Sequence, residues 1–210
     1  MNRLPNQTTN CIRQAVSRRR YGALAGRRSQ QTRAACQGRR LAAALQAVKP
    51  GRDASRQFED ACIKALWYLF KPDLRCWRVQ LTTEDSLQRR DLACRIVPAA
   101  DVWRQMWSLN SHYVVFEFKN LTDRITQKEV CGTERYLCAA AKRLVAIIIS
   151  PRGSASSADA AIGGAMREGK LIVSLSVDEL AAWLIMKDQG ADPNAFLSER
   201  VDEFFLTLGR

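Results

Sequence analysis

Three charged residues stand at spacings that suit metal-assisted phosphodiester chemistry. Glu117 and Lys119 lie two residues apart at the end of an apolar run, and Asp91 precedes Glu117 by 26 residues. Side chains two apart on a strand point to the same face, so Glu117 and Lys119 should project together. Two carboxylates suit Mg²⁺, or Mn²⁺, because these hard cations prefer oxygen ligands. We therefore predict a cation held by Asp91, Glu117 and the backbone carbonyl of Phe118, with Lys119 beside the attacking water.

A strand-end ion pair is the simpler explanation of the same residues. Glu117 and Lys119 can pair with each other without a metal, and Asp91 can pair with Arg89 or Arg95. Charges at the end of an apolar strand cost desolvation energy, which pairing, hydrogen bonding or metal binding offsets. The choice between the two explanations depends on whether Asp91 and Glu117 lie on neighbouring strands.

The surrounding elements are expected to bring these strands together. Apolar residues at three- and four-residue spacing predict a helix over 55–70, which carries Glu59 near its start. Later patterns predict strands over 75–82, 87–97 and 113–118, a helix over 126–141, a strand over 144–150, a helix over 156–168, a strand over 170–175, and helices over 179–187 and from 193. This order predicts an α/β fold with a central mixed sheet flanked by helices.

The positive charge of the chain is concentrated before residue 51. Residues 1–50 contain ten arginines, one lysine and no Asp or Glu, whereas residues 51–210 contain 22 basic and 21 acidic residues. Large apolar residues are scarce in residues 1–50, which predicts a basic arm that is disordered or partly helical. We therefore expect two parts, the arm over 1–50 and a folded domain over 51–210.

Three interpretations of this arm stay open. Its arginine pairs and triplet are candidates for sequence-independent contacts with the phosphates of DNA: Arg18, Arg19, Arg20, Arg27, Arg28, Arg39 and Arg40. An Arg-rich, acid-poor segment is also typical of an organelle transit peptide. It can equally be a solvated tail, or an upstream extension from a misplaced start.

Cysteine usage and hydropathy bear on the compartment. The chain has seven cysteines without a C-x-x-C pair and a single histidine, so we expect neither a zinc site nor haem attachment. Most of these cysteines have apolar neighbours, which predicts small buried residues in a reducing compartment. No apolar run approaches the roughly 18 residues of a membrane span. We therefore expect a cytoplasmic protein without a membrane partner.

The motif order resembles that of the PD-(D/E)xK nuclease superfamily, which has the restriction-endonuclease-like fold. In that family, an acidic residue on the first helix, an Asp, and the acidic residue and Lys of the (D/E)xK motif form the active site. These positions correspond here to Glu59, Asp91, Glu117 and Lys119, and the resemblance makes Glu59 a further candidate ligand of the metal. Arg90 stands where the family name has Pro, a position that varies within the family. The resemblance covers roughly residues 53–150, or 53–175 with the later α/β units.

The resemblance implies a Mg²⁺-dependent nuclease acting on DNA, with RNA not excluded. Many relatives cut as dimers because a duplex has two strands, so a homodimer is a further expectation. Gln127 and Lys128 open the next helix, where many relatives place a residue that assists the site. The alternative is a nuclease-like fold that binds DNA or assembles with partners without catalysis.

Overall fold

The computed structural model of the protein describes residues 36–82 and 89–209. The described residues from Gly38 onward belong to one compact unit, Gly38–Arg210. Its elements follow in the order α2 (Gln37–Gln46), the short 3₁₀ helix η1 (Arg52–Ala54), α3 (Ser55–Phe70), β1 (Leu74–Thr82), β2 (Arg89–Ile96), α4 (Asp101–Ser108), β3 (Tyr113–Phe118), α5 (Gln127–Glu134), β4 (Val145–Ser150), α6 (Ser156–Arg167), β5 (Leu171–Ser176), α7 (Val177–Asp188) and α8 (Pro193–Thr207). The arginine clusters at 18–20 and 27–28 lie outside the described residues.

The five described strands form one mixed sheet in the order β1-β2-β3-β4-β5. Strands β1, β2 and β3 pair antiparallel, and β3, β4 and β5 pair parallel. The parallel pairs follow from the chain order, because helices α5 and α6 provide the long crossovers that parallel neighbours need. The expected α/β fold, with a mixed sheet flanked by helices, is confirmed.

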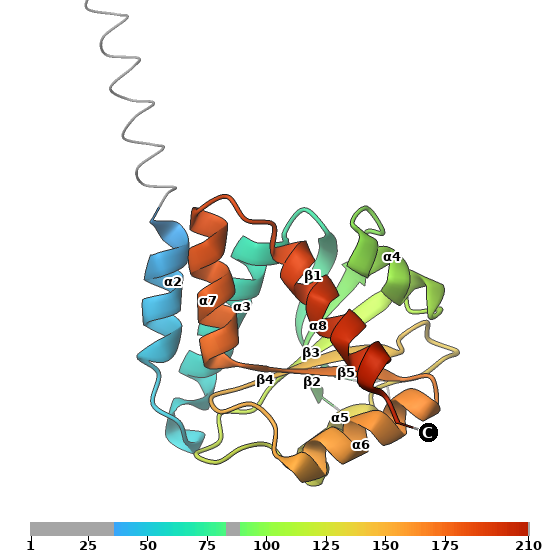
Figure 1. The fold of residues 1–210 in the computed structure, drawn as a ribbon. Helices are drawn as coiled ribbons and strands as arrows, with labels where there is room; N and C mark the ends of the chain where they lie inside the picture. The colour runs from blue at the N-terminus through green and yellow to red at the C-terminus, as the bar shows by residue number, and fades with distance from the viewer. Residues whose placement is uncertain (1–35, 83–88, 210) are drawn as a thin grey trace, which may run out of the picture. The chain divides into compact units, whose positions relative to one another are not determined.

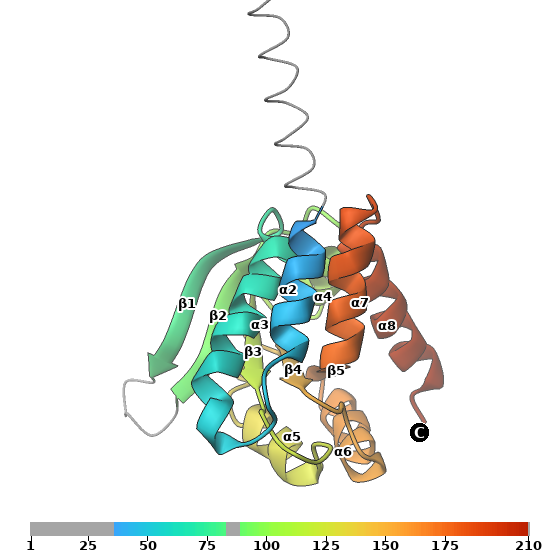
Figure 2. The same cartoon turned by 90° about the vertical axis from the view of Figure 1, so that its left-hand side faces the viewer.

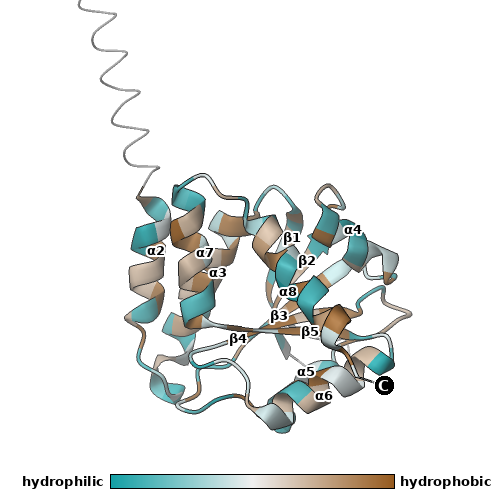
Figure 3. Ribbon diagram, viewed as in Figure 1, coloured by the Kyte–Doolittle hydropathy of each residue, from teal (hydrophilic) through white to brown (hydrophobic). Residues whose placement is uncertain are grey.

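Helices cover the two faces of the sheet unequally (Figures 1 and 2). One face packs against α2, α3, α4, α7 and α8 around a large apolar core that includes Phe58, Trp103 and Phe116. The opposite face packs against α5 and α6 around a smaller core that includes Val115 and Ile148. Figure 3 shows the corresponding pattern, with strands β3–β5 largely hydrophobic and the helices mixed. Side chains that alternate along β3 therefore enter two different environments.

The folded unit begins earlier than the sequence predicted. Helix α2 falls within the stretch assigned to the arm, yet Ala42, Leu45 and Val48 are buried in the larger core. The carboxylate of Asp188 accepts hydrogen bonds from the backbone N–H groups of Gly38 and Arg39, at 2.8 and 2.9 Å. The boundary therefore lies near residue 38 and not at residue 50. Arg39 and Arg40 are exposed on this docked helix.

The stretch after β3 also differs from the prediction. The expected helix over 126–141 ends at Glu134. Residues Cys138 and Arg143 then pair with each other through backbone hydrogen bonds of 2.7 and 3.1 Å. Lys142, inside this turn, has a φ of 52°, which a helix does not accommodate. The turn replaces the last helical residues and returns the chain to β4.

The cysteines are less buried than the sequence suggested. Of the six in the described part of the chain, Cys62 and Cys94 are buried, whereas Cys36, Cys76 and Cys138 are exposed. Apolar neighbours in the sequence do not fix burial, because residues at the start of an edge strand or in a turn face solvent. Within the described residues, no helix is long and apolar enough to cross a membrane.

Candidate active site

Asp91 and Glu117 lie side by side on one face of the sheet. Strands β2 and β3 pair Leu92 with Phe116 and Ala93 with Val115. Continuing this antiparallel register by one residue places Asp91 opposite Glu117. Residues opposite each other share a face, and Val115 shows that this face is the one that packs against α5 and α6. The predicted juxtaposition of Asp91 with the strand that carries Glu117 is therefore present.

A hydrogen bond fixes the carboxylate of Asp91 at the end of β3. Its Oδ2 accepts the backbone N–H of Phe118 at 2.8 Å. The N–H and C=O groups of one strand residue point to the same side, so the carbonyl of Phe118 should also point towards β2. This orientation agrees with the proposal that the Phe118 carbonyl adds an oxygen beside the two carboxylates.

Glu117 and Lys119 form a short ion pair that satisfies only one carboxylate oxygen. Lys119 Nζ lies 2.6 Å from Glu117 Oε1. The residue Glu117 is only 3% exposed, whereas the Lys119 side chain is 30% exposed. Within the described residues, Glu117 Oε2 is buried without a hydrogen-bond partner. A strand-end ion pair explains one half of this carboxylate and leaves the other oxygen at a desolvation cost.

Burial dominates the protonation of this pair. It raises the pKa of Glu117 from 4.5 to about 7, even though Lys119 lowers it, and the charge of Asp91 raises it further. Burial lowers the pKa of Lys119, but the charge and hydrogen bond of Glu117 outweigh it, so the net shift is upward. Lys119 is therefore an ammonium at neutral pH. A bound cation would favour the ionised form of Glu117, because opposite charge lowers the pKa of a carboxyl.

Glu59 lies on helix α3, which packs against the face of the sheet opposite to Asp91 and Glu117. On helix α3, its Oε1 accepts a hydrogen bond from Gln80 Nε2 at 3.3 Å. Burial raises the pKa of the Cys62 thiol, and the charges of Asp91 and Glu59 raise it further. Both carboxylates therefore act on one thiol of α3. Within residues 36–82 and 89–209, however, no three His, Cys, Asp or Glu side chains are grouped as a metal site.

Asn120, the residue after Lys119, has a structural role. Its side-chain Nδ2 donates hydrogen bonds to the carbonyl oxygens of Lys49 and Gly51, at 3.0 and 2.7 Å. The Gly51 N–H donates in return to the Asn120 carbonyl at 3.1 Å. Gly51 has a φ of 128°, which is readily available only to glycine. These bonds join the end of β3 to the segment that leads into α3.

The two helix-start candidates are exposed, and a residue that sequence reasoning missed lies closer. Gln127 and Lys128 occupy the first turn of α5, and neither is hydrogen-bonded or ion-paired to Asp91 or Glu117. Tyr136 is half-buried after this helix. Burial raises the pKa of its hydroxyl, and the charge of Glu117 raises it further. No sequence signal marked Tyr136, because its position depends on where α5 ends.

An exposed basic surface continues the same face of the sheet over β1 and β2. Arg75 pairs with Arg95 and Arg95 with Tyr113, while Arg78 pairs with Ala93. All three arginines and Tyr113 are exposed. Because paired residues share a face, these side chains point to the side that carries Asp91 and Glu117. Figure 2 shows β1 and β2 extending beyond the region over α5 and α6.

Comparison with protein-family models, curated proteins and solved structures finds no match to this chain. Asp91 and Glu117 offer hard oxygen ligands, and the buried, unpartnered Oε2 of Glu117 is a group that a divalent cation would satisfy. The residues present therefore fit Mg²⁺ or Mn²⁺, with water or substrate oxygens filling the remaining positions.

Proposed function

We propose that this protein is a metal-dependent nuclease that hydrolyses phosphodiester bonds of DNA. One observation carries the proposal: Glu117 is buried beside Asp91 and Lys119 with one carboxylate oxygen unpartnered among the described residues. In a purely structural ion pair at a strand end, such an oxygen costs desolvation energy and forms no compensating interaction. A carboxylate that ligates a cation uses this oxygen as the coordinating atom.

The order of elements supports a restriction-endonuclease-like core. Glu59 lies on the helix α3 that precedes the sheet, Asp91 on the second strand, and Glu117 and Lys119 at the end of the third. Helix α5 and the buried strand β4 follow, as the resemblance to the PD-(D/E)xK superfamily implies. The proposed membership of this superfamily rests on this order and on the site residues together.

Each residue has a defined task in the proposed reaction. Asp91, Glu117 and the carbonyl of Phe118 would hold Mg²⁺, which supplies Lewis-acid stabilisation of the charge that grows on the phosphate. Lys119 is an ammonium at neutral pH, so it donates hydrogen bonds and does not accept a proton. It therefore orients the attacking water or the phosphate. Glu59, on α3, is a further candidate ligand of the cation, and its Oε1 accepts a hydrogen bond from Gln80.

The basic sheet surface provides a path for the substrate. Arg75, Arg78 and Arg95 contact solvent on the face that ends at Asp91 and Glu117. Guanidinium groups bind phosphates well, and an exposed aromatic ring such as Tyr113 can stack on a base. We propose a DNA strand lying across β1 and β2. A homodimer that cuts both strands of a duplex is part of the same proposal.

The test is cleavage by the purified full-length chain. Supercoiled plasmid, linear duplex, single-stranded DNA and RNA are each incubated with Mg²⁺, Mn²⁺ or EDTA. We expect cleavage of DNA with either metal, none in EDTA, and none by Asp91→Asn. Glu134→Gln is the matched control, because Glu134 also accepts a 2.6 Å contact from a lysine but lies outside the site. Absence of cleavage with every substrate, or cleavage by Asp91→Asn at the wild-type rate, would refute the proposal.

The alternative is a DNA-binding module that does not cleave. The 2.6 Å contact between Lys119 and Glu117 favours it, because a closed ion pair can be stable without a cation. Calorimetric titration with Mg²⁺ separates the two functions. A nuclease should release or absorb heat on Mg²⁺ binding, and Asp91→Asn should remove that heat. A module that only binds DNA should show no such heat.

A further inference from the structure

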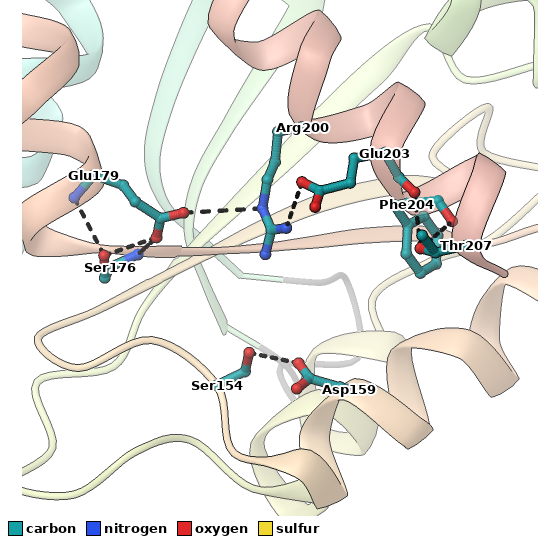
Figure 4. A network of polar contacts seen from close by, with 8 residues as sticks. All are labelled: Ser154, Asp159, Ser176, Glu179, Arg200, Glu203, Phe204 and Thr207. Atoms are coloured by element: carbon teal, nitrogen blue, oxygen red, sulfur yellow. Dashed lines mark hydrogen bonds and ion pairs between the residues drawn. The ribbon is translucent and has the colours of Figure 1, made fainter.

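A cavity of about 750 Å³ lies along β5, the last strand of the sheet order. Its walls come from the loop after β4, the first turns of α6 and α7, and one side of α8. Figure 4 shows Arg200, Glu203 and Phe204 of α8 on one side of this region, and Ser154 and Asp159 on the other. A cavity of this size holds a small organic ligand, since ligand sites commonly span about 300–1,000 Å³.

Two buried polar atoms on the cavity wall have no hydrogen-bond partner among the described residues. Ser174 is 5% exposed, and its Oγ is buried without a hydrogen bond. Arg200 Nε is likewise buried without one. Its nearest carboxylate oxygens, on Glu179 and Glu203, lie 3.9 Å from Nε and 3.6 Å from a terminal nitrogen, beyond hydrogen-bond distance. Buried polar atoms are normally satisfied, so Ser174 Oγ and Arg200 Nε are candidate contacts for water or a ligand in this cavity.

Cationic groups on the cavity wall are available to an anion. Arg152 is exposed at the wall and makes no hydrogen bond or ion pair within the described part of the chain. Arg200 makes two long ion pairs, with Glu179 and Glu203, and Arg124 uses one terminal nitrogen on the Ser154 carbonyl at 3.0 Å. Guanidinium groups present paired donors that match the oxygens of a phosphate. The cavity can therefore bind one phosphoryl group.

The carboxylates on the wall set a limit on that anion. All four have partners: Glu179 Oε2 accepts the Ser176 N–H and Oγ at 2.7 Å, and Asp159 accepts Ser154 Oγ at 2.5 Å. Asp178 Oδ1 accepts a hydrogen bond from Gln46 Nε2 at 3.2 Å, and Glu203 Oε2 lies 3.6 Å from a terminal nitrogen of Arg200. Glu203 and Asp178 can accept hydrogen bonds from donors such as sugar hydroxyls. Their negative charge disfavours a polyphosphate.

An aromatic side chain on the cavity wall can accept a planar ring of the ligand. Phe204 is partly buried at the cavity wall, next to the apolar side chains of Ile162 and Ile172. An aromatic face with apolar neighbours accepts a stacked nucleobase. From one phosphoryl group, hydroxyl donors and a planar ring, we infer that this cavity binds a nucleoside monophosphate. The phosphate lies at Arg152 and Arg200, the ring lies on Phe204, and Ser174 Oγ hydrogen-bonds a polar atom of the ligand.

This site is separate from the proposed nuclease site. Neither Asp91, Glu117 nor Lys119 lines the cavity. The register places Glu117 beside Ile148 and Ile148 beside Ser174, so two strand spacings, roughly 10 Å, separate Glu117 from Ser174 along the sheet. Binding of the monophosphate therefore does not depend on the proposed nuclease activity, and either can fail without the other.

The experiment is calorimetric titration of the full-length protein in EDTA, which removes any metal-dependent binding at the carboxylates. The probes are AMP, GMP, CMP and UMP, with adenosine, ribose 5-phosphate, inorganic phosphate and ATP as partial or oversized ligands. We expect at least one monophosphate to bind with 1:1 stoichiometry, and adenosine, inorganic phosphate and ATP to bind at least about tenfold more weakly.

Variants locate the binding. Arg200→Gln and the surface change Arg152→Gln should each weaken binding of the monophosphate about tenfold, and Ser174→Ala should weaken it severalfold. Asp91→Asn and the exposed control Arg135→Gln should bind as the wild type does. Circular dichroism of each variant confirms that it is folded.

Three results would overturn the inference. One is the absence of binding by all four monophosphates at millimolar concentration. Another is wild-type affinity in folded Arg152→Gln and Arg200→Gln proteins. The third is equal affinity for inorganic phosphate, which would leave no role for the ring and Phe204.

Discussion

Two lysine–glutamate ion pairs of equal length lie in different surroundings in this protein. Lys119 and Glu117 are 2.6 Å apart at the end of β3, and Lys170 and Glu134 are 2.6 Å apart between β5 and α5. The Glu117 side chain is 4% exposed, whereas that of Glu134 is 24% exposed. Lys170 also contacts Glu168 at 2.8 Å. Lys119 therefore pairs with one buried carboxylate, whereas Lys170 pairs with two accessible ones.

The two lysines act on their glutamates in the same direction, but the net pKa shifts are opposite. The hydrogen bond from Lys170 lowers the pKa of Glu168, the ordinary consequence of an ion pair in solvent. Lys119 also lowers the pKa of Glu117, but burial outweighs it and the net pKa rises to about 7. Distance alone thus fails to separate a structural ion pair from a candidate site. Burial, a second carboxylate and an unpartnered oxygen separate them.

The largest expected contrast is in catalysis. Glu117→Gln should reduce Mg²⁺-dependent DNA cleavage at least about a thousandfold, because a catalytic cation supplies several kcal/mol of transition-state stabilisation. Glu134→Gln should leave the rate within about twofold. Initial rates of plasmid nicking measure both. Similar decreases in the two variants would show that the pairs differ in burial but not in role.

The pH dependence of stability should separate the same two variants without a metal. The pKa of Glu117 is raised in the folded state, so its ionisation destabilises the protein. This cost is absent below about pH 4.5, grows between about pH 4.5 and 7, and reaches up to about 3 kcal/mol above pH 7. Glu117→Gln removes it. Urea midpoints in EDTA should therefore rise for Glu117→Gln relative to wild type from pH 5 to pH 8.

Glu134→Gln supplies the control for that measurement. It removes an accessible partner of Lys170, so its midpoint should fall by the equivalent of about 1 kcal/mol or less, without a gain above pH 7. A flat difference between Glu117→Gln and wild type across pH 5–8 would contradict the raised pKa of Glu117.

The two lysines should also differ in what their removal costs. Lys119→Met leaves the buried Glu117 carboxylate without its cation, and a destabilisation of about 2 kcal/mol is expected at pH 8 in EDTA. The destabilisation should be smaller at pH 5, where Glu117 is protonated. Lys170→Met should cost about 1 kcal/mol or less. Chemical unfolding at both pH values measures these differences, and equal costs at pH 8 would remove the distinction between the pairs.

The smallest effects concern DNA affinity. A protein without residues 1–35 has eight fewer arginines, and its log affinity for DNA should fall less steeply with log salt than that of the full chain. Arg75→Gln with Arg95→Gln should reduce the slope by about one unit for each phosphate that the variant no longer binds. Arg135→Gln is the exposed control. Fluorescence anisotropy at several salt concentrations gives the slopes, and unchanged slopes would refute both phosphate-binding surfaces.

The sequence predicted the elements that rest on regular patterns. The helix over 55–70 and the strand over 113–118 have the predicted bounds, because apolar spacing in each agrees with burial. The alternation along β2 also placed Asp91 on the same face as Glu117. Such local rules hold for a helix that buries one face, such as 55–70, and for a short apolar run that is covered on both faces, such as 113–118.

Other features depend on contacts that a sequence pattern does not contain. Helix α5 ends at Glu134 because Cys138 pairs with Arg143, although the residues between them favour a helix. The start of the domain was placed too late because Leu45 and Ala42 acquire their burial from α7 and α3. The unpartnered Glu117 Oε2 and the proximity of Tyr136 likewise follow from the packing of several elements.

The docking of α2 has a consequence for the order of folding. Gly38 fits so closely against α7 that a Cβ atom there would lie 1.9 Å from the Leu184 carbonyl oxygen, and its N–H bonds Asp188, 150 residues later. At a synthesis rate of about 5–20 residues per second, helix α7 therefore emerges roughly 8–30 s after α2. The side of α2 that faces α7 stays exposed during that time. Closure of the large core is thus a late event in the biogenesis of this chain.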